Sequence, residues 1–321
     1  MTNRTVDNWQ RLGTSKTSKK SNKNRKSVTV KVPKTENIIF IGSEMHYDSF
    51  WWKMMFVAAA YPFIRSSKFR KCNKATIAYM NNGYTHAEKL AIEWLENSIH
   101  ADLVDFKAIN SKEDLINTLK NNRKSFKIQD VAFFCHGLNG IITMNLDSKP
   151  KVNLEVSDLT SIPSSAFVAS GKLYSYACRT GISDSFLLRA KDNYNDLSEA
   201  EPENSLAQRI ADHFSIEVHA YYKRTSYAEI IRNKSESSSI VALLKEKRQN
   251  FSDSAILDLS NNYQALKHDG LAENGIPFVS GARGEGTNGY ALWRNNGGQN
   301  LPTAAGTPAG LPSHMAIFRK K

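Results

Sequence analysis

Short apolar runs alternate with amphipathic segments from residue 37 onward. Runs of this kind are typical of strands buried in a parallel sheet, and they cover residues 37–42, 75–81, 101–109, 131–136, 172–178 and 216–222. Helical spacing of apolar positions predicts helices over 47–63, 85–99, 111–120 and 205–214, with Thr85 and Ser111 as N-terminal caps. Strands that alternate with helices predict an α/β fold: a three-layer sandwich with a mainly parallel central sheet and helices on both faces.

The last hundred residues have a weaker pattern. Residues 226–249 have helical spacing, and short strands are expected at 276–280, 290–293 and 315–318. Residues 297–312 are rich in Gly, Pro and Ala, which indicates a loop. We therefore expect a core over 37–225 and a C-terminal extension over 226–321, which together make one domain over 37–321.

The first 36 residues differ from the rest in composition and charge. Ten of the 43 Lys and Arg residues but only two of the 31 Asp and Glu residues lie there, so this segment carries eight of the twelve net positive charges. With few apolar side chains, residues 1–36 are expected to be a disordered basic tail. The alternative is an electrostatic arm for an acidic partner, an anionic membrane or a secretion chaperone, while a nucleic-acid partner is not favoured.

Targeting signals also bear on the class of protein. No apolar run follows the basic N-terminal residues as a signal peptide requires, and the most apolar stretch, residues 50–64, contains Lys53 and Pro62. We expect no transmembrane segment. The sequence predicts a protein that is cytoplasmic where it is synthesised and, if exported, leaves by a route other than the general secretory pathway.

Neither a metal nor a cofactor is expected. The three cysteines, Cys72, Cys135 and Cys178, have no zinc-ligand spacing. Glu44, His46 and Asp48 alternate after the first strand, and we interpret them as polar loop residues rather than a metal cluster. The GxGxxG pattern of residues 284–289 has no acidic residue after it to bind a ribose.

Two predicted strands end in residues that can carry covalent chemistry. One ends in His136 and Gly137, and the other ends in Cys178. Neighbouring parallel strands would bring these ends together, and a cysteine nucleophile needs both a base and an oxyanion hole. Cys135 should point to the opposite face of its strand and lie in the core. Cys72, among basic residues, is expected in a loop or at the surface, and His219 is a weaker candidate for the partner of Cys178.

This pair of motifs resembles the caspase-like (clan CD) cysteine peptidases, which include caspases, metacaspases, gingipains and bacterial CHAT-type proteases. The sequence YACRTG from Tyr176 to Gly181 is similar to the caspase QACRG signature, with Thr180 inserted before the glycine. The resemblance covers about residues 37–225. It implies that Cys178 is the nucleophile, that His136 is the general acid and base, and that the N–H groups of Gly137 and Cys178 form the oxyanion hole.

The same resemblance bears on substrate recognition. Tyr176 stands where relatives carry a specificity residue, and Arg224 and Tyr227 lie in the stretch that leads into the substrate pocket of caspases. Residues 187–205 resemble the processed linker of caspases in their position, although a solvated acidic loop is the simpler explanation. The carboxylates of this segment are also ligands of the kind that calcium takes, and some members of the family bind calcium.

The expected activity is that of a thiol protease, a hydrolase that cleaves protein substrates through a Cys/His dyad and an acyl-enzyme. A bacterial effector or toxin would fit this combination of features. The alternative is a catalytically inactive caspase-like binding module that uses its basic tail as a contact.

Overall fold

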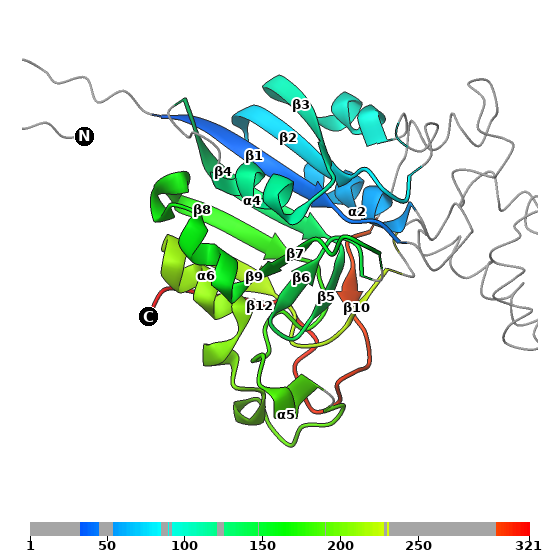
Figure 1. The fold of residues 1–321 in the computed structure, drawn as a ribbon, viewed down its shortest axis with the longest axis vertical. Helices are drawn as coiled ribbons and strands as arrows, with labels where there is room; N and C mark the ends of the chain where they lie inside the picture. Colours follow the sequence, from blue (N-terminus) through cyan, green and yellow to red (C-terminus); the bar gives the residue numbers. More distant parts are fainter. Residues whose placement is uncertain are drawn as a thin grey trace, which may run out of the picture. The chain divides into compact units, whose positions relative to one another are not determined.

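A computed structural model describes residues 33–44, 54–84, 92–120, 125–146, 148–189, 191–227 and 300–321, together with Lys89 and Ile230. Its centre is a seven-stranded sheet (Figure 1). In spatial order the strands are β12 (Ala316–Phe318), β9 (Glu217–Ala220), β8 (Phe167–Ser175), β4 (Phe126–Phe134), β1 (Lys34–Ile41), β2 (Cys72–Met80) and β3 (Ala101–Ile109). All neighbours are parallel except β12, which runs antiparallel to β9 at the edge.

Helices cover both faces of this sheet, so the predicted α/β class is confirmed. On one face α2 (Met55–Ile64) packs on β1 and β4. On the other face α4 (Lys112–Lys120) and α6 (Leu206–Phe214) bury their apolar sides (Figure 1). Serine caps begin both of the latter helices, because Ser111 Oγ accepts from Asp114 N–H and Ser205 Oγ from Gln208 N–H.

The six predicted core strands all occur, five of them with shifted ends. The largest shifts are in β4 and β8, which begin at Phe126 and Phe167 rather than at residues 131 and 172. The strand β1 begins at Lys34 rather than at residue 37. Residues 34–36 were therefore wrongly placed in the tail: their polar side chains resemble the segment before them, but Glu36 is buried and contacts Thr76 and Lys74 of β2. Residues 1–32 lie outside the described part of the chain.

Smaller elements surround the end of the sheet. A second sheet consists of β5 (His136–Leu138), β6 (Ile141–Thr143) and β7 (Asn153–Glu155), and a third pairs β10 (Thr225–Ser226) with β11 (Thr303–Ala304). The remaining helical elements are α5 (Phe186–Arg189), η1 (Trp94–Ser98), η2 (Val156–Ser161), η3 (Ser164–Ala166), η4 (Ser198–Ala200) and η5 (Pro202–Asn204).

The C-terminal segment returns to the core. The strand predicted at 315–318 is present as β12, and the loop predicted over 297–312 contributes the short strand β11. The elements predicted at 226–249, 276–280 and 290–293 fall almost wholly outside the described residues, as do Thr85 and much of the helix predicted at 85–99. No helix in the part that the structure describes has the length and apolar character to cross a membrane.

The strand order fixes where a site is expected. From β1 the chain builds the sheet first toward β2 and β3, and then on the other side of β1 with β4, β8 and β9. The order reverses between β1 and β4, and in open α/β sheets the crevice outside the carboxyl ends of such strands is the usual binding position. Arrowheads in Figure 1 show β1, β4 and β8 ending on the same side of the molecule.

Candidate active site

His136 lies at this reversal point and faces a buried carboxylate. It follows β4 by two residues and is the first residue of β5. Its Nε2 lies 2.7 Å from Oε2 of Glu44, whose side chain is 2% exposed. The direction of approach is outside hydrogen-bond geometry, so the pair is a close polar contact. A carboxylate beside one ring nitrogen can orient an imidazole and stabilise it when it is protonated.

Glu44 is a site residue that sequence reasoning missed. It follows the end of β1 by three residues, and β1 and β4 are paired up to Ile41 and Phe134. Two adjacent parallel strands therefore carry Glu44 and His136 to the same place. Glu44 had been interpreted as a polar loop residue; its partner is His136, while His46 and Asp48 lie outside the described residues. Among the residues with described positions, no cluster of His, Cys, Asp and Glu could hold a metal ion.

Gly137 brings the two predicted catalytic segments together. A Cβ added to Gly137 would lie 2.7 Å from the nitrogen and 2.5 Å from the oxygen of Cys178, and 2.8 Å from the Cβ of Ala177. Only a glycine permits this approach. Contact between two backbone segments, the one that carries His136 and the one that carries Cys178, therefore requires a glycine at position 137.

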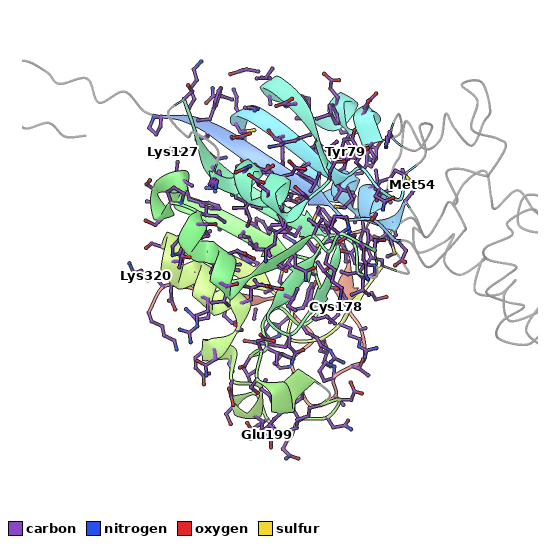
Figure 2. The ribbon with its side chains drawn as sticks, in the orientation of Figure 1. Met54, Tyr79, Lys127, Cys178, Glu199 and Lys320 are labelled. Atoms are coloured by element: carbon purple, nitrogen blue, oxygen red, sulfur yellow. The ribbon has the colours of Figure 1, made fainter. Side chains whose placement is uncertain are left out.

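Cys178 lies on the turn after β8, the neighbour of β4 in the sheet. In Figure 2 it lies at the side toward which these strands run, far from Lys127 near the start of β4. Its Sγ accepts a hydrogen bond from Thr225 N–H at 3.2 Å and lies 3.2 Å from Thr225 Oγ1. Cys178 is partly exposed, unlike the other two cysteines.

The residue after Cys178, Arg179, gives this turn an unusual backbone conformation. Arg179 has a φ of 57°, in the left-handed region that costs most residues free energy. Its N–H donates to Lys223 O, and its buried guanidinium pairs with Asp192 Oδ1 at 2.8 Å. These contacts connect the Cys178 segment to the chain that follows β9 and to the segment that contains Asp192.

Two backbone N–H groups near Cys178 are available to a ligand. In the part of the chain with described positions, nothing accepts a hydrogen bond from the Cys178 N–H. The two-residue turn of the β5–β6 hairpin closes on the pair Leu138–Ile141, and antiparallel alternation makes the next pair, Gly137–Ile142, non-hydrogen-bonded. The N–H of Gly137 therefore points away from β6.

An aromatic wall lies behind the imidazole. The ring of Phe56, from α2, contacts His136 edge-on with 5.0 Å between centroids, and it meets Tyr227 in the same way at 4.9 Å. Phe56 and Tyr227 are both buried. This packing limits the movement of the imidazole and excludes water from the side of the ring that faces the core.

The three predicted substrate-binding residues have different environments. Tyr176 is buried and stacks on Phe134, with its hydroxyl toward Lys68. Tyr227 is buried as well, and its hydroxyl donates to Tyr176 O at 3.1 Å. Both are core residues, so their predicted contact with substrate does not fit the structure. Arg224 is exposed and precedes Thr225, which touches the Cys178 sulfur.

The competing candidates lie elsewhere. Cys135 is buried in the core as predicted, and burial raises the pKa of its thiol. Cys72 begins β2 and is buried, which raises the pKa of its thiol to about 11, so its prediction as a surface residue was wrong. His219 lies within β9, where it contacts Glu217 Oε1 at 2.7 Å and stacks on Tyr174. It is engaged away from the Cys178 turn.

The segment 187–205 is more anchored than an exposed loop. Asn193 forms a bridge with Ala309, Tyr194 and Ala200 are buried, and Ser183 N–H donates to Ala200 O. Lys191 also pairs with Glu199. Backbone bonds thus connect this segment both to the C-terminal segment and to the chain that follows Cys178.

Comparisons with protein-family models, curated proteins and solved structures find no match for this chain. The chemical interpretation of the site therefore depends on its geometry and on the sequence motifs.

Proposed function

We propose that this chain is a caspase-like cysteine endopeptidase that cleaves protein substrates with Cys178 as nucleophile and His136 as general acid and base. The observation that carries the proposal is the contact of Gly137 with the Cys178 backbone. It joins the ends of two adjacent parallel strands, one with an imidazole beside a buried carboxylate and the other with a partly exposed thiol.

The reaction follows from these groups. His136 takes the thiol proton, and the Cys178 sulfur attacks the peptide carbonyl carbon to form a C–S bond. The N–H groups of Gly137 and Cys178 would bind the oxygen that becomes negative. His136 then returns the proton to the leaving amine as the C–N bond breaks. Water, activated by the same imidazole, hydrolyses the thioester and restores the thiol.

Glu44 has a positioning role in this scheme. Because its carboxylate faces Nε2, the other ring nitrogen, Nδ1, is the one left to exchange a proton with the sulfur. A buried carboxylate also stabilises the imidazolium that forms when the thiol loses its proton.

Labelling with a peptidyl acyloxymethyl ketone tests the proposal. It should modify Cys178 and leave Cys72 and Cys135 unmodified, and prior substitution of His136 by Ala should greatly slow the reaction. Failure of Cys178 to react in the folded protein, or equal reaction of the His136→Ala variant, would favour the inactive binding module instead.

A further inference from the structure

We propose that Thr225 is a further catalytic residue, which holds the Cys178 sulfur through two hydrogen-bonding groups and stabilises it when it is charged. The proposal rests on the function given above. Thr225 belongs to β10, and it approaches the sulfur from 47 positions away in the chain. No motif in the sequence singles it out.

The two contacts have different roles because the groups differ. The Thr225 N–H is a fixed donor, 3.2 Å from Sγ. The hydroxyl lies at the same distance from Sγ, but it also donates to Tyr176 O at 2.8 Å. A hydroxyl has a single hydrogen. While that hydrogen is on Tyr176 O, the Thr225 oxygen can only accept from the thiol, which fixes the rotamer of the sulfur.

The arrangement allows the hydroxyl to change partner when the thiol loses its proton. A negatively charged sulfur has no hydrogen to donate, so the Thr225 hydroxyl can rotate toward it and donate instead. The carbonyl of Tyr176 keeps a partner during this change, because Tyr227 Oη donates to it at 3.1 Å. Two donors from one residue would then face the thiolate, without leaving a buried carbonyl unpaired.

The C-terminal segment holds Thr225 in this position. Thr225 pairs with Ala304 of β11. The backbone of the preceding residue, Arg224, makes two hydrogen bonds to the same C-terminal segment: its N–H donates to Thr307 O, and its carbonyl accepts from Ala305 N–H, both at 2.8 Å. The ladder thus uses the backbone of Arg224 and leaves the N–H of Thr225 for the sulfur.

The rate at which iodoacetamide alkylates Cys178 in the full chain tests this inference. The reaction forms an S–C bond and releases iodide, so it needs a thiolate but no peptidase activity. Thr225→Val removes the hydroxyl and keeps the shape and the N–H, and Thr225→Ser keeps both groups. Thr303→Val makes the same change at an exposed side chain in the paired strand β11.

Loss of one hydrogen bond to the charged sulfur that reacts corresponds to about tenfold in rate. A sulfur without that bond is intrinsically about threefold more nucleophilic. We therefore expect alkylation of Thr225→Val at neutral pH to be about threefold slower, with Thr225→Ser and Thr303→Val close to wild type and all melting temperatures similar.

Alkylation of folded Thr225→Val at the wild-type rate, or an equal loss in Thr225→Ser, would overturn the role of the hydroxyl. This readout also separates the two proposals. A slower reaction in Thr225→Val supports the contact with sulfur even if no protein substrate is cleaved, whereas absence of cleavage in all variants would count against the peptidase function alone.

Discussion

Gly137 and Cys178 are in backbone contact so close that no side chain fits between them. A Cβ at position 137 would be 2.7 Å from Cys178 N, a distance that real Cβ atoms do not reach. The neighbours it would meet are mostly backbone atoms, which cannot move aside as a flexible side chain could. The glycine at position 137 therefore fixes how closely the segment that carries His136 approaches the turn that carries Cys178.

Gly137→Ala should consequently damage both stability and activity. Because the added methyl forces the Cys178 turn away, we expect a loss of about 1–3 kcal/mol in the free energy of unfolding, measured by urea denaturation, and a large fall in kcat. Gly306→Ala is the matched control, since a Cβ there meets no atom within 4 Å. Wild-type stability and activity in Gly137→Ala would show that the contact is not needed.

Glu44→Gln should reduce kcat with little effect on KM. The substitution keeps the shape of the side chain but removes the charge beside Nε2 of His136. Removal of a charge-assisted contact of this kind should lower kcat by about 10- to 100-fold. Glu36→Gln changes another buried glutamate of the same chain region, on β1 itself, and should leave the kcat of the folded protein unchanged. Equal effects of the two substitutions on kcat would remove the special role of Glu44.

Arg224→Glu should change substrate preference. Its side chain is exposed next to Thr225, so reversal of its charge should lower kcat/KM for peptides with an acidic P1 residue relative to a basic one by about tenfold or more. Tyr176→Phe, a change within the core, and Arg209→Glu, on the exposed side of α6, should leave this ratio unaltered. A ratio that follows Tyr176 and not Arg224 would restore the original expectation for Tyr176.

Acid should destabilise the protein in part through Glu217. A hydrogen bond from Lys172, with further ones from His219 and Arg319, lowers the pKa of this carboxyl from 4.5 to about 2. The pKa of Glu217 is lower in the folded protein than in the unfolded protein. Its contribution to the free energy of unfolding is therefore complete above pH 4.5 and is lost as the pH falls from 4.5 to 2.

Unfolding curves at pH 7 and pH 3 can isolate this contribution. Glu217→Gln should be less stable than wild type at pH 7, and the difference should shrink at pH 3. Glu203→Gln, at an exposed position, serves as the control. A difference that is constant with pH would mean that Glu217 acts only by packing.

The sequence predicted the sheet well because buried parallel strands have continuous apolar runs. Residues 131–134, for example, are apolar throughout and lie in the buried end of β4. Predictions failed where a polar residue forms its hydrogen bond with a residue far away in the sequence. Glu36 resembled the tail because its partner Thr76 lies 40 positions away, and Cys72 resembled the surface because its neighbours along the chain are basic.

The candidate site was predictable only in part for the same reason. His136 and Gly137 follow β4, and Cys178 follows β8, in recognisable motifs. Glu44 and Thr225 are positioned by the pairing of β1 with β4 and of β10 with β11. Such pairings are properties of the folded chain, and short polar segments carry no pattern that reveals them.

The central claim is that Cys178 and His136 cleave proteins, and the most direct test is to sequence new protein N-termini after incubation with a whole proteome. The wild-type chain should generate a set of new N-termini with a common residue preference before the cleaved bond. Cys178→Ala and His136→Ala, both shown to be folded, should generate none, while Cys135→Ala should generate the wild-type set. The same N-termini from Cys178→Ala, or none from the wild type, would contradict the account.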